Sequence, residues 1–139
     1  MAAFDWDSNV CFVCGSAGDG LHVRFGGNAD QVQADVVVPS PYQGFGGMVH
    51  GGILAGICDD AMWHVIHQQH DDYPVTAELT VRYHKPVRVD QPLRIVGEMV
   101  SYRRRLMVAR AVIFDGSGEK VVSAEGRFMP VREDPSSSA

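Results

Sequence analysis

A single segment of this chain has apolar residues at the spacing of an α-helix. Between Ile53 and Ile66 they recur at i, i+1 and i+4 over four turns, which predicts an amphipathic helix with a wide apolar stripe. The polar residues 68–72 and the pair Tyr73-Pro74 end this pattern. Such a stripe must be buried against another layer, so the rest of the chain has to supply a surface that covers it.

The remaining segments supply strands. Residues 75–84 alternate apolar and polar side chains with a period of two. Similar runs separated by turn residues predict strands at residues 21–26, 31–38, 75–84, 93–102, 106–114 and 120–129. Short connections favour antiparallel pairing. We therefore predict an α+β fold in which a curved antiparallel sheet wraps around one long central helix, and the Val and Ile residues left on the outer face suggest oligomerisation.

Length and charge exclude several classes of protein. The 139 residues fit one domain, and 12 Lys and Arg against 17 Asp and Glu give a net charge of −5, which argues against nucleic-acid binding. No apolar run approaches the roughly 18 residues that span a membrane. The acidic N-terminus and the odd count of three cysteines indicate a cytoplasmic protein. We expect a domain over residues 1–131, including an N-terminal extension over 1–18, and a disordered tail over 132–139.

The start and the middle of the predicted helix carry groups that could perform chemistry. Gly51 and Gly52 lie where the loop meets the helix. The first N–H groups of a helix have no internal partner and can hold a developing oxyanion, although a Gly pair can also be merely a turn. Asp59 and Asp60 flank the apolar stripe inside the helix. A carboxylate there is costly unless it is solvated, paired with Arg or used in a reaction.

The run from His50 to Met62, HGGILAGICDDAM, resembles the HGG-x6-D signature of hotdog-fold acyl-CoA thioesterases of the PaaI-like (4-hydroxybenzoyl-CoA thioesterase) superfamily. The opening Cys11-x-x-Cys14-Gly15 is similar to that of one subgroup. Further matches are YQGFGGMVHGG, VTAELTVRYHKPV and VVSAEGRFM, so the resemblance covers roughly residues 11–130. It implies a hotdog fold and hydrolysis of an acyl-CoA thioester to the free acid and coenzyme A.

The resemblance also implies roles for individual residues. Asp59 is the expected general base or nucleophile, with Asp60 the second choice for the acid. The Gly51 or Gly52 amide polarises the thioester carbonyl and His50 helps to shape the site, while Thr76 orients the attacking water. The site is expected between two subunits, with Asp59 of one facing Thr76 of the other. Some relatives have Asn in the preceding loop, where this chain has Gln43-Gly44, so Gln43 is the nearest candidate for that polar role.

Substrate-binding residues are predicted in two groups. Bulky side chains near the helix would contact the acyl group: Phe45, Met62 and Trp63. Basic side chains could meet the phosphates of coenzyme A: Arg82, Lys85, Arg103, Arg104 and Arg105. The three consecutive arginines could equally be a solvated hairpin tip. We expect a homodimer or dimer of dimers with no cofactor, and the alternative function is a non-catalytic hotdog protein that binds acyl-CoA or another small ligand.

Two weaker patterns involve metal-ligand residue types. Cys11-x-x-Cys14 is half of a zinc site or a redox pair, and His22 and Cys58 are the nearby candidates for further ligands. Structural packing is the favoured interpretation, so no metal site is predicted. Three histidines recur at i, i+3 and i+6, and exposed or hydrogen-bonded side chains are favoured over a metal site: His64, His67 and His70.

Overall fold

A computed structural model of the chain describes residues 5–6, 8–16, 19–28 and 30–131. The expected disordered tail over 132–139 lies outside these residues. Within them, the elements follow in the order β1 (Gly26–Gly27), β2 (Gln31–Val37), a short 3-10 helix (Ser40–Tyr42), α1 (Gly51–His70), β3 (Pro74–Tyr83), β4 (Pro92–Arg103), β5 (Leu106–Phe114) and β6 (Lys120–Pro130).

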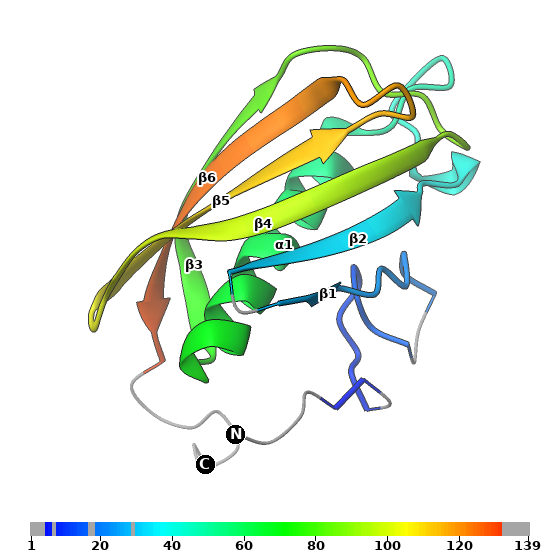
Figure 1. The fold of residues 1–139 in the computed structure, drawn as a ribbon. Helices are drawn as coiled ribbons and strands as arrows, with labels where there is room; N and C mark the ends of the chain where they lie inside the picture. Colours follow the sequence, from blue (N-terminus) through cyan, green and yellow to red (C-terminus); the bar gives the residue numbers. More distant parts are fainter. Residues whose placement is uncertain (1–4, 7, 17–18, 29, 132–139) are drawn as a thin grey trace.

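The strands form one antiparallel sheet in the order β1-β2-β4-β5-β6-β3. The sheet curves around α1, which lies along its concave face (Figure 1). This is the predicted α+β architecture with one long helix. Each of β4, β5 and β6 alternates between side chains directed at the helix and side chains directed outward, as the period of two requires.

The helix packs closely on the middle of the sheet. Its stripe of apolar side chains is almost completely buried, with Ile57, Ala61, Met62 and Val65 at 0% exposure. Opposite them, Gly97 in β4 allows the two layers to approach, because a Cβ at this position would lie 2.9 Å from the Ala61 carbonyl oxygen. The absence of a side chain at Gly97 therefore allows the helix to pack this close to the sheet.

The first predicted strand is wrong in its position. Only Gly26 and Gly27 pair with β2, whereas residues 21–25 are not part of the sheet. His22 has a φ of 56°, which breaks the extended backbone that a strand needs. This stretch pairs instead with the N-terminal segment, since the Leu21 and Val23 N–H groups donate to the carbonyls of Phe12 and Val13.

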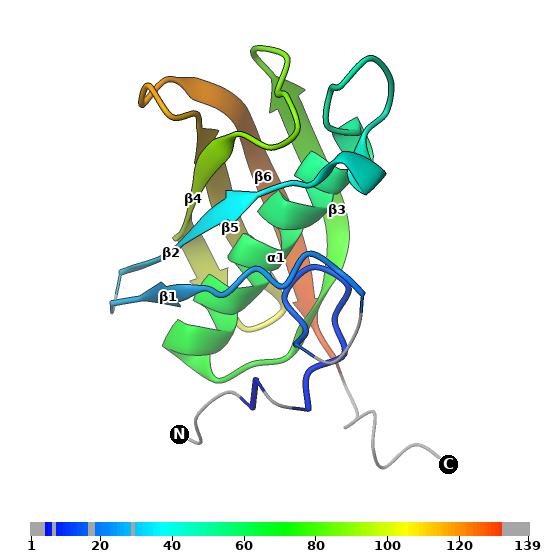
Figure 2. The ribbon, with the colours of Figure 1, turned by 90° about the vertical axis from the view of Figure 1, so that its right-hand side faces the viewer.

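The N-terminal segment lies across the side of α1 that the sheet does not cover (Figure 2). Val13 and Cys14 are buried there, and Gly56 of the helix faces Val13 closely enough that a Cβ would lie 3.6 Å from the Val13 side chain. Trp6 stacks on His64 with ring centroids 5.2 Å apart. In the described residues, no helix is long and apolar enough to cross a membrane.

Strand β3 is an edge of the sheet. It pairs with β6 on one side only, and most of its ten residues are exposed. The pairing with β6 shifts register between Thr76 and Glu78, so Ala77 is an extra residue in a β-bulge. Bulges of this kind commonly re-aim a side chain beside a functional site. Thr76 precedes this bulge.

Candidate active site

The amino end of α1 is built around His50. This residue is the N-cap, and its Nδ1 accepts a hydrogen bond of 2.9 Å from the Gly52 N–H. Because Nδ1 accepts, the neutral ring carries its proton on Nε2. The Gly52 N–H is therefore already hydrogen-bonded. His50 acts as the side-chain cap of the helix.

The Gly51 N–H is in a different situation. As the first residue of the helix it has no acceptor inside the helix, and none of the described residues accepts from it. Its carbonyl oxygen accepts a hydrogen bond of 2.7 Å from the Tyr83 hydroxyl at the end of β3. Of the two glycines named by the sequence, Gly51 is thus the one with an amide available to a ligand.

Asp59 lies near the middle of α1, close to the start of β3. The Thr76 hydroxyl donates to its Oδ1 over 2.6 Å. Burial raises the pKa of the Asp59 carboxyl above its ordinary value, and the hydrogen bond from Thr76 opposes that rise. No Lys or Arg pairs with this carboxylate in the described part of the chain, so it remains available for reaction.

The expectation that Asp59 of one subunit faces Thr76 of another is wrong for this pair, because the two residues are hydrogen-bonded within one chain. The helix brings them together: β3 begins four residues after α1 ends and runs back along it. The bulge at Ala77 follows directly. Asp59 and Thr76 therefore form a preassembled pair in a single copy of the protein.

Asp60 points to another environment. Its Oδ1 lies 3.6 Å from Cys11 Sγ, and its Oδ2 lies 3.6 Å from His64 Nε2. Burial raises the pKa of Asp60 to about 6, with hydrogen bonds from Cys14 and Cys11 opposing the rise. Burial also lowers the pKa of His64 to about 4. Adjacent acids in the sequence thus have different partners, one toward β3 and one toward the N-terminal segment.

A cavity of about 490 Å³ connects these groups. Its walls include both helix acids and the aromatic ring of Trp63, while the N-terminal segment supplies the opposite wall. The lining residues are Asp5, Ser8, Asn9, Val10, Cys11, Cys14, Asp59, Asp60, Trp63 and Tyr73. A cavity of this size is adequate for a small acyl group. Asp59 thus places a carboxylate on the wall of a ligand-sized space.

The Gly51 amide and the Asp59 carboxylate, the two candidate reactive groups, are far apart in one chain. Gly51 and Asp59 are eight residues apart on one straight helix, which places them about 12 Å apart along its axis. A thioester carbonyl cannot contact both at once. The Gly51 amide and the Asp59 carboxylate of one chain therefore do not converge on the same point.

The residues predicted to contact the acyl group separate into three environments. Trp63 lines the cavity and its indole N–H donates to the Pro74 carbonyl over 2.9 Å. Met62 is wrong as a pocket residue, because it is fully buried in the core beside Gly126. Phe45 is 83% exposed in the loop before the helix, and Gln43 of that loop accepts from the Gly47 N–H over 3.1 Å. Gln43 thus holds the loop in its turn.

The predicted basic residues occupy opposite ends of β3. Arg104 and Arg105 lie in the turn after β4 and line a surface hollow of about 720 Å³ with Met129 and Pro130. These last two residues pair with Val75 and Pro74, next to Thr76. Arg103 ends β4 and is exposed. At the other end, Arg82 is exposed, whereas Lys85 forms an ion pair of 2.5 Å with Glu119.

Each of the three helix histidines contacts a neighbouring side chain or carbonyl group. His64 and His67 are buried and hydrogen-bonded, to Cys14 Sγ over 3.3 Å and to the Asp72 carbonyl over 3.0 Å. His70 stacks on Tyr102. Sequence analysis missed Tyr83 as a site residue. Tyr83 lies at the end of a predicted strand, seven residues after Thr76. This position in the same strand as Thr76 could have indicated that it belongs to the site.

Comparisons with known proteins agree with this fold. The family model described as "Thioesterase superfamily" matches residues 46–122. Among curated proteins there is no significant match. The solved structure of a thioesterase superfamily protein, RHA08564, is 32% identical, with 79% of this chain and 57% of that chain covered and a TM-score of 0.72. This chain thus spans little more than half of that protein.

More distant structures share the fold. A hypothetical thioesterase from Streptococcus pneumoniae, solved with coenzyme A, is 24% identical over 78% of this chain and 88% of that chain, with a TM-score of 0.73. The E. coli PaaI protein from the phenylacetic acid degradation operon is 15% identical over 80% of each chain, also with a TM-score of 0.73. The matched segment includes the Gly pair, both helix acids and Thr76, and the chain belongs to the thioesterase superfamily, with the hotdog fold.

Proposed function

We propose that this protein hydrolyses acyl-CoA thioesters, with Asp59 as the reactive carboxylate. The observation that carries the proposal is the pair of Asp59 and Thr76, which lies beside a cavity and forms no ion pair with a Lys or Arg of the described residues. Membership of the thioesterase superfamily supports the reaction class. The S. pneumoniae relative was solved with coenzyme A, and variants of that protein in which one Thr or one Asp is replaced by Ala have also been solved.

The chemistry needs few groups. A thiol of pKa about 8.5 is a good leaving group, so no strong general acid is required. Thr76 donates its proton to Asp59 and can accept one from water, which orients that water toward a carbonyl carbon. Asp59 then takes the proton as water attacks, the carbonyl oxygen becomes an oxyanion, and the carbon–sulfur bond breaks as the acid and coenzyme A form.

A second route uses the same carboxylate as a nucleophile. Asp59 would attack the carbonyl carbon and release coenzyme A as a thiolate, and water would then hydrolyse the mixed anhydride that forms. Single-turnover hydrolysis in oxygen-18 water tests this second route, because label enters the Asp59 carboxylate only if the anhydride forms and water attacks its Asp59 carbonyl. Label in the enzyme would therefore establish the anhydride, whereas label in the product acid is expected from direct attack by water and from attack on the acyl carbonyl of the anhydride.

The oxyanion donor is assigned to Gly51 of a second copy of the chain. The distance of about 12 Å along one helix excludes the Gly51 amide of the same copy. Strand β3 offers a way to join two copies, because its outer edge is unpaired among the described residues and ten residues long. We therefore infer a dimer in which the two β3 strands pair antiparallel.

This pairing would complete two equivalent sites. Antiparallel pairing of β3 with its copy brings the start of one strand, with Thr76, beside the end of the other, with Tyr83. The Tyr83 hydroxyl already holds the Gly51 carbonyl, so the partner's helix start would arrive close to Asp59. Each site then takes its carboxylate from one copy and its amide from the other.

Binding of the nucleotide is assigned to the arginine turn. Arg104 and Arg105 are exposed at a hollow whose other wall is the end of β6, close to Thr76. Guanidinium groups suit phosphates because they donate two parallel hydrogen bonds. Coenzyme A would then lie on the surface while its acyl group enters the cavity beside Trp63.

The test measures free-thiol release from a panel of acyl-CoA substrates by the full chain and by Asp59→Asn. We expect Asp59→Asn to lower kcat by at least about 100-fold, as loss of a positioned base does. Asp35→Asn is the matched control, because Asp35 is an exposed acid on β2 that forms an ion pair with Arg94, away from the cavity. Near-normal turnover by Asp59→Asn would refute the assignment, and tight acyl-CoA binding without thiol release would indicate a binding protein.

A further inference from the structure

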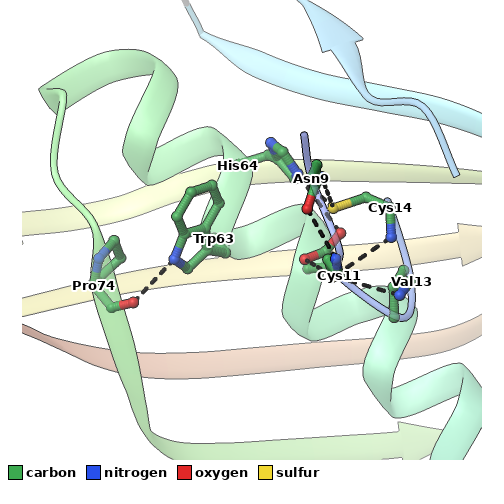
Figure 3. A network of polar contacts seen from close by, with 8 residues as sticks. Asn9, Cys11, Val13, Cys14, Trp63, His64 and Pro74 are labelled. Atoms are coloured by element: carbon green, nitrogen blue, oxygen red, sulfur yellow. Dashed lines mark hydrogen bonds and ion pairs between the residues drawn. The ribbon is translucent and has the colours of Figure 1, made fainter. Parts of the chain in front are cut away.

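Four side chains of metal-ligating types meet on the side of α1 away from the sheet. Cys11 and Cys14 come from the N-terminal segment and His64 from the helix (Figure 3). Asp60 lies one helical turn before His64. The two sulfur atoms and an Asp60 carboxylate oxygen all lie within 4.8 Å of one another. His64 Nε2 lies 3.3 Å from Cys14 Sγ and 3.6 Å from Asp60 Oδ2.

The backbone of the Cys-x-x-Cys loop is shaped to hold negatively charged sulfur. The N–H groups of Val13 and Cys14 point at Cys11 Sγ over 3.4 and 3.5 Å, and the Asn9 amide donates to Cys14 Sγ over 3.1 Å (Figure 3). The loop closes through the Gly15 N–H, which donates to the Cys11 carbonyl. Burial and the neighbouring Asp60 carboxylate raise the pKa of the Cys14 thiol, and the hydrogen bond from Asn9 opposes that rise. A cation bound at the two sulfurs would stabilise the thiolate, which is the form of Cys that binds metals.

The Asp60 carboxylate is the second observation that points to a ligand. Its Oδ2 is buried and has no hydrogen-bond partner among the described residues. A buried acceptor without a donor is costly, and here two cysteine sulfurs add further electron-rich atoms around it. A cation at the centre of this cluster would satisfy the carboxylate and both sulfurs at once.

We propose that Cys11, Cys14, Asp60 and His64 bind one Zn²⁺ per chain. In a tetrahedral zinc site, ligand bonds of about 2.0–2.3 Å place neighbouring ligand atoms about 3.3–3.8 Å apart. The separations of 3.3 Å between Cys14 Sγ and His64 Nε2, 3.6 Å between Cys11 Sγ and Asp60 Oδ1, and 3.6 Å between Asp60 Oδ2 and His64 Nε2 lie in this range. The two distances to Asp60 involve different oxygens of its carboxylate, so either oxygen faces a neighbouring ligand. Two thiolates with an imidazole favour zinc over magnesium or calcium.

The rings around His64 keep it in place for this role. Trp6, Phe25 and Trp63 lie with ring centroids 5.2, 5.0 and 5.1 Å from that of His64. Among the described residues, the group within 4.8 Å consists of Cys11, Cys14 and Asp60, and His64 adjoins it through its contacts with Cys14 and Asp60. His22 and Cys58, the candidates that the sequence offered for further ligands, are not in this group. Cys58 is instead fully buried in the core.

With four protein ligands the site would be structural. The zinc would fasten the N-terminal segment to α1 at Asp60, directly after Asp59, and so fix the wall of the cavity that this segment provides. This inference goes beyond the proposed function and does not depend on it, because metal binding is measured without turnover.

The experiment uses the full chain, purified under reducing conditions without chelator. We expect about one zinc per chain by elemental analysis. The metal-stripped protein reconstituted with Co²⁺ should show the visible bands of a tetrahedral site and a thiolate-to-cobalt charge-transfer band. Cys14→Ser, Asp60→Asn and His64→Gln should each weaken metal affinity by more than about 100-fold, beyond what loss of a second-sphere partner causes.

The adjacent acid provides the matched control. Asp59→Asn should keep the zinc while it loses turnover, so failure of the metal site and failure of the catalytic assignment are distinguishable. Cys58→Ala should also keep the zinc, because that thiol lies in the core. A reduced wild-type chain that neither contains zinc nor binds Co²⁺ overturns the proposal, and so does a Cys11–Cys14 disulfide in the purified protein without metal.

Discussion

Thr76 has a more specific task at the candidate site than contact with substrate. Its hydroxyl is the donor that reaches Asp59 Oδ1, and the bulge after it fixes the direction of its side chain. Replacing Thr76 by Ala would remove the hydrogen bond that opposes the rise in the pKa of Asp59, while the burial that raises this pKa would remain. The residue thus holds the Asp59 carboxylate, and in the proposed reaction it would also orient the water.

We therefore predict that Thr76→Ala lowers kcat by about 10- to 1,000-fold, the range for loss of a positioned proton-transfer partner or polar donor. Thr76→Ser should keep most of the turnover, because it retains the hydroxyl. Steady-state kinetics with one acyl-CoA substrate measures both. Equal losses in the two variants would mean that Thr76 acts through packing and not through its oxygen.

The residues of the cluster beside Asp59 show where prediction from sequence ends. Both acids and the Cys-x-x-Cys pair were visible in the sequence, and Asp59 was assigned from its place after the Gly pair. The partners of Cys11 and Cys14 were not, because Asp60 and His64 lie 49 and 50 residues away along the chain. Spacing in sequence carries no information on such a contact until the fold is known.

At the scale of elements, the helix and the long strands were predictable because their apolar periods are local. The first strand was wrong, since the positive φ of His22 and the pairing of residues 21–23 with the N-terminal segment depend on tertiary contacts. The helix begins at Gly51, because His50 caps the Gly52 amide. An apolar pattern that starts at Ile53 cannot show this.

The contact between helix and sheet predicts the effect of one substitution. Gly97→Ala would place a Cβ 2.9 Å from the Ala61 carbonyl oxygen, so either the helix or β4 must move. We expect the free energy of unfolding to fall by about 1–3 kcal/mol, as overpacking does. Urea unfolding at fixed protein concentration measures it. Gly26→Ala, which has open space around its Cβ, should change it far less.

The β4–β5 turn carries a prediction about substrate recognition. Replacing Arg104 and Arg105 by Ala should raise KM for acyl-CoA much more than KM for a short acyl thioester without the nucleotide, because only the first has phosphates for the guanidinium groups. Replacing Arg110 by Ala on the outer face of β5 is the control, since that residue pairs with Glu98. Equal changes in KM for both substrates would contradict nucleotide binding at this turn.

For the whole molecule, the proposed dimer forms through the edge of β3 that no other described strand pairs with. Thr80 is exposed near the middle of this strand, so an antiparallel pair of β3 strands brings it close to the two-fold axis. We predict that Thr80→Asp favours the monomer, because like charges then face each other, whereas Thr80→Ser remains dimeric. Sedimentation velocity measures both states. A dimeric Thr80→Asp protein with full activity would argue against pairing through β3.

The distance between Gly51 and Asp59 has a genetic consequence. Pro is tolerated at the first position of a helix and removes its N–H, and the ψ of 132° at His50 suits a residue before Pro. In the proposed dimer, a chain with Gly51→Pro should then inactivate only the site to which it contributes the Gly51 amide. When Gly51→Pro chains are mixed with Asp59→Asn chains, heterodimers should form in which one active site carries both substitutions and the other carries neither. The mixture should therefore be active although each variant alone is inactive.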